Sequence, residues 1–382
     1  MNRRIDPYLF AIVATLVIGG LVMVYSASAM VAADWSGDGT QYIKRQFIAV
    51  VIGTGLCVGS ALTSMRTFRK YRYVFYIASI FGLLLCYVPG IQHRVNGASR
   101  WIGFGSAHLQ PAEFAKIAMM IMLADYLHRW RGQIQDHRVL VRAFLIPLPL
   151  MLLVFPQPDF GTTVIIGGLA ALMIFVAGMS AKHILLTGSL GLIVGIPAMF
   201  LEQYRIQRFM SFLDPWENAQ GAGYHTIQSW LAMHSGGMWG QGLGNSIAKL
   251  HFLPEPWTDY IGAVLAEELG FVRLVMLIAL YVLFVWRGIH IAKRARDAFS
   301  MYLAATITVM VGAEACFNLG VVMGILPPKG LVLPFISYGA TAMITHLWAV
   351  GLLFGIAAEA DETPVHEGWS KHLSEASLRQ AN

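Results

Sequence analysis

Charged residues and cysteines are what this sequence has little of. Of its 382 residues, 13% are Asp, Glu, Lys or Arg, whereas 57% are hydrophobic. A soluble globular domain carries roughly a quarter charged residues, so the composition indicates an integral membrane protein. The three cysteines, Cys57, Cys86 and Cys316, each lie in an apolar run. We therefore expect them to be buried as small hydrophobic side chains, and expect neither a disulfide framework nor a zinc site.

Long apolar runs, by contrast, recur along the whole chain. A helix of about 20 residues spans a bilayer, and these runs are too continuous for the alternating strands of a membrane barrel. The sequence predicts ten transmembrane helices, at about 8–30, 46–63, 73–89, 114–127, 141–156, 160–178, 183–201, 260–286, 300–323 and 334–357. The expected fold is all-α and polytopic, with a single transmembrane domain over 1–358 and a polar cytoplasmic tail over 359–382.

Basic residues give the predicted orientation. They are concentrated in segments 64–72, 128–142 and 287–299, which follow spans two, four and eight, and Arg3 and Arg4 lie on the same side. The positive-inside rule makes that side cytoplasmic, so both termini are predicted to lie in the cytoplasm. The net charge of +6 follows from this topology. No nucleic-acid partner is needed to explain it.

One long segment on the predicted outer side, residues 202–259, is neither a polar linker nor a span. A stretch at 224–233 is weakly amphipathic, and 236–244 is too rich in glycine for a helix interior. Loops of this length in compact proteins are usually functional. The segment ends at Asp259, and two adjacent acids at 267–268 follow inside the eighth span, where charge is costly. This junction is therefore the first candidate for a site.

The charged residues near this outer side have two interpretations each. Asp259 either caps the eighth helix, since an acid at a helix start satisfies free N–H groups, or it acts as a general base. Spacing alone favours the cap, and the two roles are compatible. Glu113 and Lys116 share a helix face, either as a self-compensating pair or as a cation oriented toward an anionic ligand. Arg100 and Lys249 add positive charge on the same side.

Polar residues inside the spans need partners. Glu314 and Asn318 lie four residues apart in the ninth span, and Asn318 is expected to be a helix–helix contact. Glu314 is more costly to bury, and Arg273 in the eighth span is a candidate partner for it. Asp159 precedes the sixth span and is expected to cap it.

Several short motifs resemble those of one known family. They are YSAS (25–28), NGASRW (96–101), QPAEFAK (110–116), QPDFGT (157–162), GQGLG (240–244), PEPWTDYIGAVLAEELG (254–270), NLGVV (318–322), PPKG (327–330) and LPFISYG (333–339). In this order they resemble the SEDS family, the polytopic peptidoglycan polymerases that include FtsW and RodA. Lys329 and the tract at 21–26 resemble the FtsW branch, which serves cell division.

The resemblance implies a glycosyltransferase that polymerises lipid II into β-1,4 glycan strands during septal cell-wall synthesis, on the outer face of the cytoplasmic (inner) membrane. The family's essential aspartate falls on Asp259, with the implied role of general base in an inverting transfer. The implied substrate-binding residues are Arg100, Glu113, Lys116, Lys249 and Lys329. A divalent cation, Mg or Mn, is implied with ligands unknown. The implied partners are a class B penicillin-binding transpeptidase and other divisome proteins.

Other functions remain open from the sequence. A lipid II flippase would depend on the charges inside the spans, at Lys116, Arg273 and Glu314, and would not depend on Asp259. The sequence is also compatible with a division scaffold and with a RodA-type elongation polymerase. Several positions depart from the family's usual pattern: Trp257 stands where His is common, Tyr260 where Phe is usual and Ala340 where a second Gly is typical. The most telling departure is Arg273, which stands where a glycine is usual. The acids at 267–268 are expected to have a structural or site-shaping role.

Overall fold

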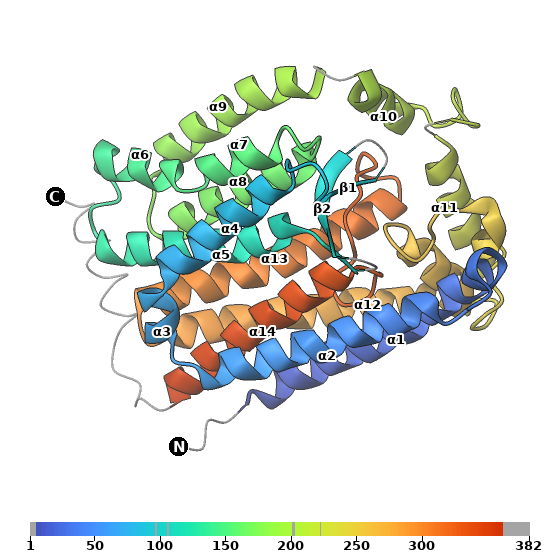
Figure 1. Cartoon of the computed structure of the whole chain (residues 1–382), viewed down its shortest axis with the longest axis horizontal. Helices are drawn as coiled ribbons and strands as arrows, with labels where there is room; N and C mark the ends of the chain where they lie inside the picture. Colours follow the sequence, from blue (N-terminus) through green and yellow to red (C-terminus); the bar gives the residue numbers. More distant parts are fainter. Residues whose placement is uncertain (1–4, 96–97, 105–106, 201–202, 222, 362–382) are drawn as a thin grey trace.

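The computed structural model describes residues 5–95, 98–104, 107–200, 203–221 and 223–361, and they form a bundle of helices (Figure 1). The helices of the first half are α1 (Pro7–Ser36), α2 (Gln41–Leu62), α3 (Met65–Lys70), α4 (Arg72–Leu85), α5 (Pro111–Arg129), α6 (His137–Leu145), α7 (Leu148–Val154), α8 (Phe160–Val176) and α9 (Ala181–Phe200). The second half contains α10 (Gln203–Leu213), α11 (Tyr224–Gly236), the π-helical turn η1 (Ala248–Phe252), α12 (Ile261–Arg294), α13 (Ala298–Val322) and α14 (Ala340–Asp361).

A helix occupies each of the ten predicted spans, which confirms the all-α polytopic fold. Within the described residues, six helices are long and apolar enough to cross a membrane: α1, α2, α6 together with α7, α12, α13 and α14. Helices α4 and α8 are apolar but shorter. Most of the predicted tail, 362–382, lies outside the described residues. Of the three free cysteines, Cys57 and Cys86 are buried, whereas Cys316 is exposed on α13, so its predicted burial is wrong.

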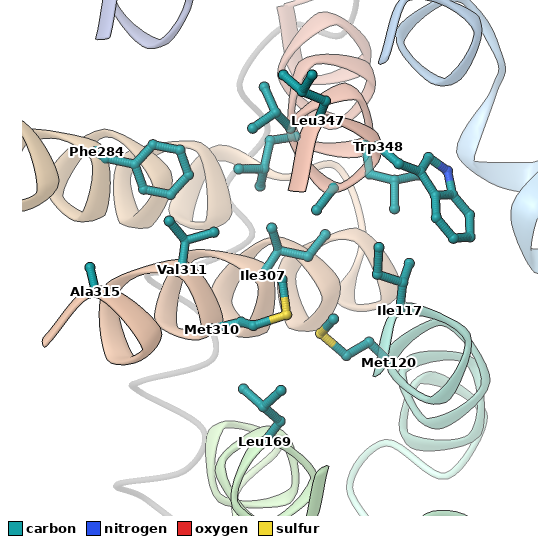
Figure 2. Close-up of a cluster of buried hydrophobic side chains, with 14 of the residues drawn as sticks. Ile117, Met120, Leu169, Phe284, Ile307, Met310, Val311, Ala315, Leu347 and Trp348 are labelled. Atoms are coloured by element: carbon teal, nitrogen blue, oxygen red, sulfur yellow. The ribbon is translucent and has the colours of Figure 1, made fainter. Parts of the chain in front are cut away.

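Helix α13 lies at the centre of the bundle. It packs against α5, α8, α12 and α14. Figure 2 shows Ile307, Met310 and Val311 of α13 between Ile117 of α5 and Phe284 of α12, and all five side chains are buried. Close packing of this kind fixes the relative positions of the surrounding helices. Polar side chains on α13 are therefore held in place by an apolar core.

The fifth span is broken into α6 and α7 at Pro147. Proline has no N–H to donate and its ring clashes with the preceding turn, so an α-helix does not continue through it unbroken. A second proline, Pro149, follows within the first turn of α7. The two helices nevertheless cover the length of one span, from His137 to Val154.

A three-stranded antiparallel sheet, which the sequence did not predict, lies between α4 and α5. Its strands are β1 (Gln92–Val95), β2 (Ala98–Phe104) and β3 (Ala107–Leu109), in the order β1-β2-β3. Trp101 pairs with His93, and Ile102 pairs with Leu109. The sheet lies toward the end of the bundle opposite the start of α1 and the end of α14 (Figure 1). It places Arg100, on β2, at that end.

Helix α12 is interrupted at Gly270, within the eighth span. The backbone there has φ 82° and ψ 174°, which is not helical and which only glycine adopts readily. The freed backbone groups pair with the glycine-rich segment 237–242. Phe271 N donates to Gly237 O (2.9 Å), and Gln241 N donates to Glu267 O (2.9 Å). A break inside a span requires such replacement bonds, because the bilayer offers none.

The side chain of Arg273 binds two backbone carbonyl groups at this break. Its Nη1 donates to Leu269 O (3.0 Å), at the end of the first part of α12, and to Trp239 O (2.8 Å), in the glycine-rich segment. The side chain is exposed on the surface of the bundle. The predicted pairing of Arg273 with Glu314 is therefore wrong. An arginine in this position ties two carbonyl groups across the break.

Replacing Gly270 by alanine is expected to destabilise the protein by at least about 2 kcal/mol, because a Cβ atom would clash with Gly240 N and the backbone would remain at positive φ. The measurement is the thermal unfolding midpoint of the purified chain in detergent. Gly19→Ala is the matched control, since a Cβ there meets nothing within 4 Å. Equal midpoints for the two variants would contradict the expectation.

Candidate functional site

Asp259 lies in the turn between η1 and α12, where the long segment meets the eighth span. Helix α12 begins at Ile261, and the residue before it, Tyr260, makes no side-chain cap. The interpretation of Asp259 as a helix cap is therefore wrong. Its side chain is partly exposed. One carboxylate oxygen, Oδ2, lies so close to Gly330 that a Cβ atom there would be 2.9 Å away.

The backbone of Asp259 is held by Asn318, one of the polar residues of α13. The Nδ2 group of Asn318 donates to Asp259 O (2.8 Å) and to Leu331 O (2.6 Å). Asn318 is 1% exposed. One amide therefore joins α13 to the start of α12 and to the segment that carries Gly330. Asn318 makes the expected contact between helices, and it also holds the backbone of Asp259 and of the segment next to Gly330 in place.

The electrostatic surroundings of Asp259 raise its pKa to about 6. Burial is the main cause, and the carboxylate of Glu255 acts in the same direction. The charges of Arg208 and Arg100 act in the opposite direction. A carboxyl group with this pKa is ionised at neutral pH and is a stronger base than an ordinary aspartate.

Arg100 reaches the site from β2. Its Nε donates to Gln157 O (3.1 Å) and lies 3.9 Å from Asp159 Oδ2, and its Nη2 donates to Pro158 O. Asp159 caps α8 as predicted, since its Oδ1 accepts from Thr162 N (3.1 Å). The guanidinium group is partly exposed. The sheet and the start of α8 thus hold a cation beside the surface that contains Asp259.

Lys329 lies next to Gly330, in the segment between α13 and α14. Its aliphatic chain packs against Gly161, where even a Cβ atom would collide with it. Its Nζ lies 5.7 Å from the centre of the Phe317 ring. Burial lowers the pKa of Lys329 to about 8, and the charge of Asp159 partly offsets this effect. Within the described residues Lys329 forms no ion pair closer than 4 Å, so its ammonium group is available to an anion.

Near Lys329, four ionisable groups form a buried network between α5, α13 and α14. The Nζ of Lys116 lies 2.9 Å from Glu113 Oε2 and 2.6 Å from Glu314 Oε1. Glu314 Oε2 lies 2.6 Å from His346 Nε2. All four side chains are buried. Lys116 is therefore already paired with two carboxylates, and the partner of Glu314 is Lys116 together with His346.

Lys249 lies elsewhere, at the junction of η1, α1 and α12. Its Nζ is 2.8 Å from Glu268 Oε1, and Glu268 Oε2 accepts from Ser26 Oγ (2.6 Å). Lys249 is 3% exposed and Glu268 is 0% exposed. The neighbouring Glu267 accepts from Ser235 Oγ (3.1 Å) and from three groups at 246–248. Both acids at 267–268 thus bind the outer segment to α12, which is a structural role.

The structure brings three of the predicted site residues together and separates the others from them. Asp259 Oδ2 lies beside Gly330, the neighbour of Lys329, and the charge of Arg100 acts on Asp259. Asp159, which lies 3.9 Å from Arg100, also acts on the charge of Lys329. Glu113 and Lys116 lie in the network next to Lys329, and Lys249 is in a separate buried pair.

Sequence reasoning missed two residues. It did not single out Arg208, whose charge acts on Asp259, nor His346, the partner of Glu314. A histidine inside an apolar run was a usable signal for the second, because such a residue needs a partner.

Residues 7–362 match the family of cell cycle proteins that comprises FtsW, RodA and SpoVE. The chain belongs to this family. It is 37% identical to the probable peptidoglycan glycosyltransferase FtsW of Geobacter metallireducens, with 95% of this chain and 97% of that protein covered. It is 40% identical to the corresponding protein of Halothiobacillus neapolitanus, over 94% and 87%. It is 37% identical to stage V sporulation protein E of Bacillus subtilis, over 93% and 98%.

Solved structures of family members have the same fold. One chain of a peptidoglycan synthase complex that coordinates polymerization and crosslinking superposes with a TM-score of 0.76, at 26% identity, over 94% of this chain and 99% of that one. The rod shape-determining protein RodA of Thermus thermophilus gives a TM-score of 0.68, at 26% identity, over 94% and 98%. Family membership and fold together make this chain a multi-pass membrane protein.

Proposed function

We propose that this chain is a peptidoglycan glycosyltransferase that polymerises lipid II during division, with Asp259 as the general base. The observation that carries the proposal is a carboxyl group of raised pKa beside Arg100 and Lys329, in a chain whose relatives are named peptidoglycan glycosyltransferases. The flippase and scaffold hypotheses give no reason for this arrangement around Asp259. A RodA-type elongation enzyme would use the same site, so the division role rests on the FtsW-named relatives.

The proposed reaction is a single displacement at the anomeric carbon of the donor. The 4-hydroxyl oxygen of the acceptor sugar attacks that carbon, and its proton passes to the Asp259 carboxylate. The bond from the anomeric carbon to the pyrophosphate oxygen breaks, and the polyprenyl pyrophosphate leaves with the electron pair. Attack from the opposite face inverts an α-linked donor to a β-linked product. Lys329 and Arg100 neutralise the negative charge on the leaving group.

The remaining predicted substrate residues have indirect roles in this scheme. The charges of Glu314 and Glu113 favour the charged form of Lys329, and the charge of Lys116 opposes it. The network therefore acts on the charge of Lys329 without touching the substrate. Lys249 positions the outer segment through Glu268.

A divalent cation, Mg or Mn, remains a proposal. Among the described residues, no three His, Cys, Asp or Glu side chains lie close enough together to hold a metal ion. A cation used in the reaction would therefore bring most of its ligands from elsewhere, and the pyrophosphate of the substrate supplies suitable oxygen atoms. No step above depends on it.

The orientation and the partner are also proposals. The basic segments 64–72 and 128–142 lie at the same end of the bundle as the start of α1 and the end of α14, whereas α10 and α11, which precede Asp259 in the chain, lie toward the other end (Figure 1). The positive-inside rule then places both termini in the cytoplasm and the site outside the cytoplasmic membrane. A transpeptidase partner of class B, with other divisome proteins, is proposed from the structural neighbour, which belongs to a complex that coordinates polymerization and crosslinking.

The test of the proposed activity is lipid II polymerisation by the purified chain with its cognate transpeptidase and a divalent cation, with glycan chains separated on a gel. We expect chains from the wild type. Their absence, together with lipid II translocation in liposomes that persists without Asp259, would favour the flippase.

The pH dependence of polymerisation tests the surroundings of the base. Asp259 must be ionised to accept a proton, so activity is expected to fall as the pH drops through about 6. The negative charge of Glu255 raises the pKa of Asp259. Removing it in Glu255→Gln lowers that pKa, so the acid limb of the rate profile should move to lower pH, although solvent screening of an exposed charge keeps the shift small. Glu217→Gln, an exposed acid of the same segment, is the control and should not move the limb.

A further inference from the structure

A buried carboxylate forms ion pairs with three arginines at the end of the bundle that contains α3, the start of α1 and the end of α14. Asp125, on α5, is 3% exposed and lies 2.6 Å from Arg69 Nε, 2.8 Å from Arg72 Nε and 2.9 Å from Arg129 Nη2. The arginines come from α3, from the start of α4 and from the end of α5. None of these residues belongs to the region around Asp259.

The cluster carries more positive charge than its acid can balance. Three guanidinium groups against one carboxylate leave a net charge of +2, and like charges this close repel one another in a partly buried setting. Arg69 is 31% exposed and Arg129 is 45% exposed. Within the described residues, the Nη groups of Arg69 and the Nε of Arg129 have no hydrogen-bond partner, so these donors are available to an anion. Such a group of donors matches the oxygen atoms of a phosphate.

The surface next to this cluster is suited to a lipid. Val74, Ile77 and Phe81 of α4 are exposed and lie at spacings of three and four residues, so they form one apolar face. Tyr71 and Tyr73, at the N-terminal end of that face, are half-exposed. Lys70 lies over the ring of Tyr71 and Arg72 over the ring of Tyr73, as cation–π pairs. Tyrosines between a basic cluster and an apolar face are typical of the membrane–water interface.

We propose that Arg69, Arg72 and Arg129 form a binding site for the phosphodiester headgroup of an anionic phospholipid, with an acyl chain along the exposed face of α4. Basic pockets between transmembrane helices bind anionic headgroups in this way. The Asp125 carboxylate holds the three guanidinium groups in place before the lipid binds. The lipid phosphate supplies the missing negative charge.

The ordinary excess of basic residues on one membrane side does not explain this geometry. A second ion pair at the same end, Arg294 of α12 with Asp361 of α14, has one cation for one acid, and both side chains are about half exposed. That pair is balanced and solvated, so it needs no further anion. It supplies a matched control for the cluster around Asp125.

The test uses the full-length chain in detergent, delipidated and then titrated with phosphatidylglycerol, phosphatidylcholine or inorganic phosphate, with the thermal unfolding midpoint as the readout. We expect phosphatidylglycerol alone to raise the midpoint of the wild type. In the double variant Arg69→Gln with Arg129→Gln, half-maximal stabilisation should need at least ten times more lipid. This variant keeps Arg72 on Asp125, so the buried carboxylate stays paired. Arg294→Gln should titrate like the wild type.

Three results would overturn the proposal. If phosphatidylcholine raised the unfolding midpoint equally, the surface would bind lipid through apolar contacts alone and would not select an anionic headgroup. An equal effect of inorganic phosphate would make it an anion site that does not select lipid. A double variant that binds phosphatidylglycerol as tightly as the wild type would exclude the arginines. If that variant unfolds before it can be titrated, the single variant Arg129→Gln and native mass spectrometry of retained lipid replace it, with at least a threefold loss expected.

Discussion

Asp259→Asn is expected to reduce lipid II polymerisation by about 10²- to 10⁴-fold, the usual contribution of a general base. Asparagine has nearly the same shape, and the backbone carbonyl that accepts from Asn318 remains in place. The loss should therefore come from the missing base and not from misfolding. Glycan chains on a gel, measured with the cognate transpeptidase present, give the comparison with the wild type.

Two controls make this result interpretable. The thermal unfolding midpoint of Asp259→Asn should equal or exceed that of the wild type, because a partly buried charge has been removed. Glu255→Gln should keep most of its activity at pH 7.5, where Asp259 is ionised in both proteins. If Asp259→Asn polymerises lipid II at the wild-type rate, another group takes the proton, and the proposed role of Asp259 is wrong.

Lys249→Met is expected to destabilise the protein by about 3–5 kcal/mol, because it leaves the Glu268 carboxylate buried with Ser26 as its remaining side-chain partner. The expected consequence is a low yield and a lower unfolding midpoint in detergent. Adding Glu268→Gln should recover much of the loss, since the second change removes the unpaired charge.

The same pair of variants decides what Lys249 does. If Lys249 bound the substrate, Lys249→Met would lower activity without lowering stability. Adding Glu268→Gln would then not restore the activity. We expect the reverse, a stability defect that the double variant repairs. Lys70→Met, which removes an exposed lysine from α3, is the control and should leave the unfolding midpoint unchanged.

The sequence predicted the elements that depend on local physics. The apolar runs located the ten spans, and the cap of α8 followed from an acid before a helix start. The glycine-rich tract was correctly excluded from helix, although its pairing with the break at Gly270 was not foreseen. The sheet that carries Arg100 was missed, because its strands are short and lie in a loop with no clear alternation.

What the sequence by itself determined is the spans, several of the charged residues within them and the family to which the chain belongs. Only the tertiary structure decided which charge pairs with which. Lys116 and Glu314 are 198 residues apart, yet α5 and α13 bring them to 2.6 Å, whereas Arg273 bonds to the carbonyl groups of Leu269 and Trp239. Coulomb energy depends on distance and burial, and neither can be read from spacing along the chain when the partners lie on different helices.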